Sequence, residues 1–133
     1  MCLRSRSLSA NTAYADIKVF KVLRVCDNEF ISPYVCMTEG IVYIYQKGRN
    51  VPMENGIEPE LIRTENYAYP YRVTGGWLHA YVDENAAKND LRLFKDTCPD
   101  ENYILVEMKI PGGAKYHLGA SGDICSSCLV WED

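Results

Sequence analysis

The chain has 133 residues, of which 47% are hydrophobic and 24% charged, and its formal net charge is −4. These values are typical of one small globular domain and exclude a coiled coil, a disordered tail and a multidomain enzyme. A mildly acidic chain without a basic run is not expected to bind duplex nucleic acid or a membrane surface. It has neither an apolar run of about eighteen residues nor the apolar core of a secretory signal, so we expect a cytoplasmic protein.

The first half of the chain predicts an N-terminal arm followed by strands and a long irregular segment. Residues 1–16 are polar and lack periodicity, so we assign them to the arm and residues 17–133 to a single domain. Residues 17–25 and 41–45 are rich in β-branched and aromatic residues and predict strands. The intervening segment contains Pro33, which favours an edge strand or a bend.

Residues 46–66 are rich in Gly, Asn and Pro, and they predict an irregular loop that could act as a flap. Within this segment Pro59 precedes residues 60–63, for which we predict one helical turn. After it, Tyr67, Tyr69 and Tyr71 alternate on one side of an extended segment. No predicted strand explains these three tyrosines, so they are candidate ligand-binding residues.

The second half predicts the only helix. Residues 77–82 form a strand with Leu78, Ala80 and Val82 on one face, and Asp83 is a plausible N-cap for a helix over residues 84–95. Residues 102–110 alternate cleanly and predict a strand, with short strands at 114–118 and 129–131. We therefore predict an α+β fold: a curved, mostly antiparallel sheet of five or six strands with one main helix.

The other face of the strand over residues 77–82 carries Trp77, His79 and Tyr81. If this face is open, it forms an aromatic shelf with one titratable group, which suits a ligand. If it is closed, His79 is a half-buried residue that is hydrogen-bonded to backbone. Both interpretations stay open from the sequence alone.

Cys125 and Cys128 have the spacing of a zinc knuckle or a redox dithiol. A structural zinc needs two further ligands, which Cys26 and Cys36, nine residues apart, do not offer at the usual spacing. The alternative is a pair of small buried thiols, as free cysteines often are. We predict no bound metal and no cofactor, and Cys125 and Cys128 remain the weak metal candidates.

Two stretches resemble small uncharacterised proteins of gut bacteria and their phages. The first runs from Ala15 to Leu23 with Ser32-Pro33-Tyr34 after it. The second runs from Gly75 to Tyr81, includes the Ala-bearing helix, and continues through Val106-Glu107-Met108-Lys109-Ile110-Pro111-Gly112-Gly113-Ala114-Lys115-Tyr116 and Gly119. The resemblance covers most of residues 15–131 and implies a phage or prophage origin, but it brings no function with it.

A second resemblance is to the ADP-ribosyltransferase-like fold, through the glycine-led strand, the helix and the strand Ile104-Leu105-Val106-Glu107-Met108. This resemblance implies that Lys21 takes the place of the basic residue on an early strand. It also implies that Trp77, His79 or Tyr81 stacks on nicotinamide. No glutamate falls at the family's late catalytic position.

Two functions follow as hypotheses. The first is a small binding module for an unidentified protein or small molecule, which uses the aromatic face and the 46–72 loop. The second is a divergent ADP-ribosyltransferase-like enzyme or a protein that binds NAD or another nucleotide, with Lys21 and His79 in one concave pocket. A zinc-stabilised module that uses Cys125 and Cys128 is a third possibility.

Overall fold

The computed structural model describes residues 2–5, 9–33, 43–52, 60–63, 71–74 and 77–132. Within these residues the chain forms one helix and thirteen strands. They are β1 (Cys2–Ser5), β2 (Asn11–Thr12), β3 (Ile17–Cys26), β4 (Glu29–Ile31), β5 (Ile44–Tyr45), β6 (Gly48–Asn50), β7 (Glu60–Arg63), β8 (Tyr71–Thr74), β9 (Leu78–Tyr81), α1 (Glu84–Thr97), β10 (Asn102–Ile110), β11 (Lys115–Leu118), β12 (Asp123–Ser126) and β13 (Leu129–Trp131).

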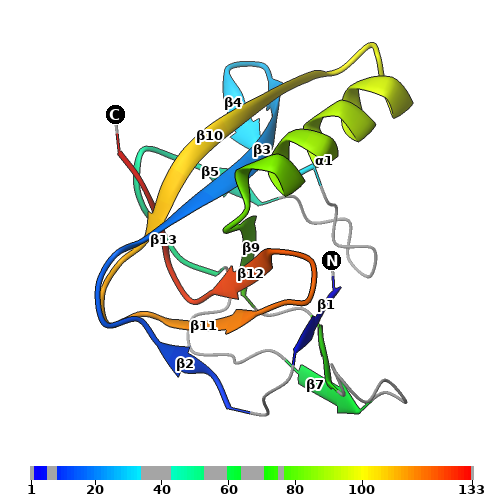
Figure 1. Ribbon diagram of the computed structural model, residues 1–133. Coiled ribbons are helices and arrows are strands. Elements are labelled where there is room, and N and C mark those ends of the chain that lie inside the picture. The colour runs from blue at the N-terminus through cyan, green and yellow to red at the C-terminus, as the bar shows by residue number, and fades with distance from the viewer. Residues whose placement is uncertain are drawn as a thin grey trace.

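The strands form two sheets, and every described pair is antiparallel (Figure 1). The larger sheet has ten strands, in the order β2-β11-β12-β9-β3-β10-β13-β6, with β4 and β5 attached beside β3. The smaller sheet has the order β1-β8-β7. The predicted α+β class with a mostly antiparallel sheet is confirmed. The predicted number of strands is too small, because strands of two to four residues carry too few side chains to show alternation.

The ladder between β3 and β10 is the spine of the larger sheet. It runs without a break from Ile17, opposite Ile110, to Val25, opposite Asn102. Side chains alternate across such a ladder, so each strand presents one face to each side of the sheet. One face carries Val19, Leu23, Met108 and Ile110, which belong to the main core. The other face is covered by α1, which contacts β3, β10 and β9.

The sheet curls around the main core. Phe30 on β4 and Trp131 on β13 lie on strands at opposite sides of the β3–β10 pair, yet their ring centroids are 4.9 Å apart in an edge-to-face arrangement. Tyr45, opposite Phe30 in the β4–β5 pair, belongs to the same core. The two flanks of the sheet therefore meet across its concave side.

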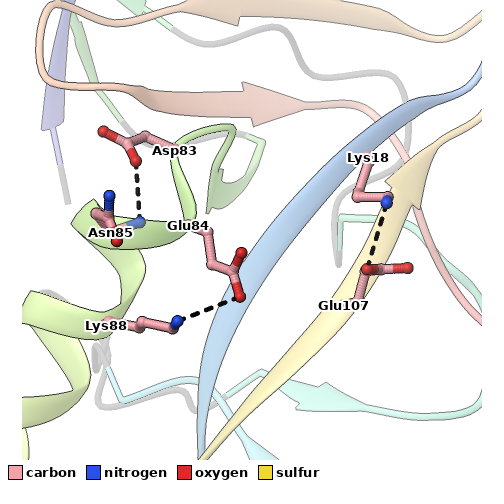
Figure 2. A network of polar contacts seen from close by, with 6 residues as sticks. All are labelled: Lys18, Asp83, Glu84, Asn85, Lys88 and Glu107. Atoms are coloured by element: carbon pink, nitrogen blue, oxygen red, sulfur yellow. Dashed lines mark hydrogen bonds and ion pairs between the residues drawn. The ribbon is translucent and has the colours of Figure 1, made fainter.

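The helix begins and ends as its sequence predicts, within two residues. The Asp83 carboxylate accepts a hydrogen bond from the Asn85 backbone N–H at 2.9 Å and caps the first turn, and Glu84 pairs with Lys88 one turn on (Figure 2). At the other end the Phe94 ring stacks on Tyr103 of β10 with centroids 5.2 Å apart. The stacked rings of Phe94 and Tyr103 dock α1 against β10, on the outside of the curl.

In the first half of the chain, three predicted segments differ in whole or in part from the structure. Residues 60–63, predicted as a helical turn, are strand β7, because pairing with β8 supplies the backbone partners that one isolated turn lacks. Parts of the predicted N-terminal arm are strands: β1 pairs with β8, and β2 pairs with β11. Of the predicted strand over residues 41–45, Ile44 and Tyr45 form β5, and residues 41 and 42 lie outside the described residues.

Candidate functional site

The two faces of β9 contact different parts of the molecule. Leu78 and Ala80 are buried in the main core, as predicted. Trp77, which precedes β9, is 8% exposed and packs with Cys125 in a second, smaller cluster against which Ala10 lies. Trp77 therefore does not present the open ring face that a shelf for a ligand would need.

A row of three residues crosses the sheet beside Trp77. His79 on β9 lies opposite Cys125 on β12, and Cys125 lies opposite His117 on β11. Directly opposed residues of antiparallel strands share a face, so this row places both histidines of the chain beside one thiol. The Trp77 and His117 rings lie 5.5 Å apart between centroids. The sequence offered no signal for His117 here, because the row depends on the register of three separate strands.

Burial sets the protonation of this row. The pKa of His79 falls to about 3, first because burial penalises the charged ring and second because the Lys21 ammonium lies near. Its Nδ1 atom is buried and has no hydrogen-bond partner among the described residues. Burial also raises the pKa of the Cys125 thiol to about 12. A neutral imidazole beside a protonated thiol is not an activated nucleophile.

Cys125 and Cys128 do not form a site together in the described part of the chain. Cys125 faces the histidines, whereas the charge that acts on Cys128 is that of Arg49 on β6, which partly opposes the rise of the thiol pKa on burial. Both cysteines are free and buried. Among the described residues, no group of three or more His, Cys, Asp or Glu side chains is placed to hold a metal ion. The geometry fits the interpretation of these residues as two small buried thiols.

Lys21 is a buried lysine, only 4% exposed, on β3. Its Nζ atom donates to the His79 carbonyl oxygen at 2.5 Å and lies 5.2 Å from the centroid of the Tyr45 ring. Burial lowers its pKa to about 8, and the Asp90 carboxylate of α1 partly opposes that shift. Lys21 therefore holds its ammonium in the core against a backbone carbonyl of β9.

The bond forms near the point where β9 diverges from β3. The two strands pair at one position, where Phe20 lies opposite Tyr81. Further along the same edge of β3, β4 pairs with residues 24–26. Since Phe20 and Tyr81 share a face, His79 shares it too, and Lys21 lies on the other face. The side chains of Lys21 and His79 therefore do not line one pocket.

Of the four predicted tyrosines, two lie among the described residues. Tyr81 is half-buried and lies opposite Asp123 on β12 as well as Phe20 on β3. Tyr71 is the first residue of β8. Tyr67 and Tyr69 lie outside the described residues.

A groove opens on the opposite flank of the sheet, where β13 diverges from β10. The two strands pair at a single position, with Lys109 opposite Val130. Beyond it lies a space of about 700 Å³, which we call the β10–β13 groove. It is lined by Asp16, Lys18, Lys47, Val106, Glu107, Met108, Lys109, Val130, Trp131 and Glu132.

The groove has an apolar floor and a charged rim. Val106, Met108 and Trp131 also pack in or against the main core, so the floor is held by the curl of the sheet. On the rim, Lys109 bridges Glu132 at 2.6 Å and Asp16 at 3.2 Å.

These bonds raise the pKa of the Lys109 ammonium, and the Gly112 N–H together with Lys109 lowers the pKa of the Asp16 carboxyl. Lys18 pairs with Glu107 at 3.8 Å (Figure 2). Among the lining residues, three lysines face three carboxylates. The rim therefore carries as many positive as negative side chains.

The wall of the groove opposite β10 is the turn between β5 and β6. Lys47 lies over the Trp131 ring, with Nζ 4.2 Å from the centroid. Asn50 is 2% exposed and holds the turn: its side-chain oxygen accepts from the Gln46 N–H at 2.9 Å, and its amide donates to the carbonyl oxygens of Gln46, Gly48 and Leu129. Sequence reasoning missed this groove because it arises where two strands separate, which no local pattern records.

The comparisons with known proteins are negative: no protein-family model, no curated protein and no solved structure matches the chain. Among the described residues, no helix has the length and apolarity needed to cross a membrane. The candidate site therefore rests on its own geometry.

Proposed function

We propose that this chain is a small binding module that holds a polypeptide partner in the β10–β13 groove. The observation that carries the proposal is the groove itself, which combines an apolar floor at Val106, Met108 and Trp131 with a rim of charged side chains. Concave sites that combine apolar side chains with convergent polar groups are common ligand-binding sites, and this groove combines both.

The charge of the rim favours a polypeptide over a polyanion. Lys18, Lys47 and Lys109 are matched by Asp16, Glu107 and Glu132, and ion pairs already engage two of the lysines. A nucleic acid or a polyphosphate would meet as much repulsion as attraction here. A peptide that pairs apolar side chains with single charges of either sign fits both the floor and the rim.

The predicted aromatic face of β9 supports this proposal less well. Trp77 is buried against Cys125 and the His117 ring, so binding through its ring would require that cluster to open. The alternative function, an NAD or nucleotide enzyme, expects Lys21 and His79 in one pocket. The register of β3 and β9 places these side chains on opposite faces, so we do not adopt it.

The two tryptophans of the chain allow a direct test. The protein is labelled with 5-fluorotryptophan, and the two fluorine signals are assigned with a Trp77→Phe variant. The capped tripeptides acetyl-Val-Lys-Val-amide and acetyl-Val-Glu-Val-amide are then titrated to millimolar concentration. We expect a saturable shift of the Trp131 signal with an unchanged Trp77 signal. A shift of Trp77 alone, or of neither signal, overturns the proposal.

A matched pair of variants locates the effect. Val106→Arg places a long charged side chain in the floor of the groove and should abolish the Trp131 shift. Leu93→Arg makes the same chemical change on α1, where Leu93 is 61% exposed, and should leave the titration unchanged. Equal effects of the two substitutions would contradict binding in the groove.

A further inference from the structure

Among the described residues, the outer edge of β10 has a strand partner at one position only. On its inner side β10 pairs with β3 at all nine positions. On its outer side it pairs with β13 only at Lys109. Along Asn102–Glu107 no described strand pairs with this edge, and no other backbone hydrogen bond to it is present among the described residues. In an antiparallel strand, every second residue directs its N–H and C=O to the same side, so these groups face outwards here.

The middle of this open edge lacks the features that usually protect one. Proline, a bulge, a left-handed residue or a central lysine each discourages pairing with another chain. Residues 102–107 contain no proline or glycine, their register with β3 is unbroken, and no positive φ occurs among them. The middle of the edge is Ile104-Leu105-Val106, and all three side chains are half-buried. Such an edge favours the addition of a strand.

The open edge and the groove are parts of one surface. Val106 and Met108 belong both to β10 and to the groove. A strand laid along β10 would therefore place every second side chain beside the apolar floor. The remaining side chains would lie on the face of Leu105 and Glu107, and Glu107 is exposed. The surface thus selects backbone in extended form, apolar side chains at alternate positions and a basic residue that competes with Lys18 for the Glu107 carboxylate.

We propose that the partner held in the groove is an extended segment of another polypeptide, which adds to β10 as a further strand of the ten-stranded sheet. This inference rests on the proposed function and names the form of its ligand. Residues 102–107 offer about 20 Å of edge, which suits a segment of about six residues. The main-chain hydrogen bonds would supply affinity, and the floor and Glu107 would supply selectivity.

The test uses the capped hexapeptide acetyl-Thr-Val-Lys-Val-Thr-Val-amide and two N-methylated analogues of it. One analogue is N-methylated at residues 1, 3 and 5, and the other at residues 2, 4 and 6. In an added strand only one of these sets of N–H groups faces β10. We expect one analogue to bind at least about tenfold more weakly than the unmethylated hexapeptide, because it loses several hydrogen bonds to β10. The other analogue should bind about as well as the unmethylated hexapeptide. Binding is measured by the Trp131 fluorine signal, and amide hydrogen exchange should slow within residues 102–107.

The outcomes separate this inference from the proposed function. If both N-methylated analogues shift the Trp131 fluorine signal as strongly as the unmethylated hexapeptide, the groove binds the peptide through its side chains. Strand addition is then wrong, and the proposed function stands. If no peptide shifts Trp131, both fail. If sedimentation shows a dimer that Leu105→Lys dissociates and Leu93→Lys does not, the edge is occupied by a second copy, and the inference of a separate partner is overturned.

Discussion

The Lys21 ammonium and the His79 backbone are hydrogen-bonded at 2.5 Å, although the two side chains lie on opposite faces of the sheet. The bond forms where β9 leaves β3 after one paired position. A charged amine in the core is costly, and burial accordingly lowers the pKa of Lys21. Lys21 thus joins β3 to β9 through a side-chain hydrogen bond and carries a desolvated charge in return.

The stability of the protein should rise with pH because of Lys21. Its folded pKa of about 8 lies below the value of 10.5 for an unfolded lysine. The unfolded chain therefore binds more protons between these values, so the penalty is fully present below pH 8 and is relieved towards pH 10.5. From pH 7 to pH 9.5 the free energy of unfolding should rise by about 2 kcal/mol more in the wild type than in Lys21→Met. Urea titrations at both pH values measure this difference, and equal pH slopes would contradict the burial of a charged Lys21.

Gly122 should be irreplaceable beside the cap of α1. Its φ is +74°, and a Cβ atom built there would lie 2.8 Å from the Asp83 Cβ. Gly122→Ala should therefore lower the free energy of unfolding by about 2–4 kcal/mol, through backbone strain and displacement of the cap. Gly113 has a φ of +92° with open space around its Cβ position, so Gly113→Ala isolates the strain alone and should cost about 1 kcal/mol. Chemical denaturation of both variants decides whether the contact with Asp83 matters.

The cysteines should separate into two classes of reactivity. Cys26 and Cys98 are exposed, whereas Cys125 and Cys128 are buried and their thiol pKa values are raised by that burial. Because thiolates are the reactive species, iodoacetamide at pH 8 should modify the first pair rapidly and the second pair only in urea. Mass spectrometry of peptides after a time course measures each site. Rapid native labelling of Cys125 would show that the row of His79, Cys125 and His117 is open to solvent.

Asn50 should be essential for the turn that walls the groove. Asn50→Asp keeps an acceptor for Gln46 but removes the amide donor that serves the Leu129 carbonyl, and it buries a charge. We expect a loss of about 3 kcal/mol or more in the free energy of unfolding. Asn11 is exposed, so Asn11→Asp is the matched control and should change stability by less than about 0.5 kcal/mol. Similar losses in the two variants would contradict the role assigned to Asn50.

Patterns confined to one segment were predictable from the sequence. Asp83 caps α1, Ala87 is its buried position, and Met108 and Ile110 lie on the core face of β10, as their spacing indicates. In each of these cases the periodicity of the segment and the burial in the structure agree, because neighbouring residues determine which face turns inwards.

Features that depend on the relation between distant strands were not predictable. His117 reaches Cys125, and through it His79, only because β11, β12 and β9 pair in one register. The groove exists because β13 leaves β10 after Lys109. Neither event has a local signature, since short strands and the points where they separate are set by pairing with partners tens of residues away.

The β3–β10 ladder also determines when this chain can fold. Ile17 pairs with Ile110, and Val25 with Asn102, so the spine of the sheet closes only after the long segment between β3 and β10 has been synthesised. Contacts so distant in sequence carry a high entropic cost of closure, and they place the protein among slow folders, on a scale of milliseconds to seconds. Until then β3 exposes Val19, Val22 and Leu23 without its main partner. During synthesis this strand is therefore the segment on which we expect a molecular chaperone to act first.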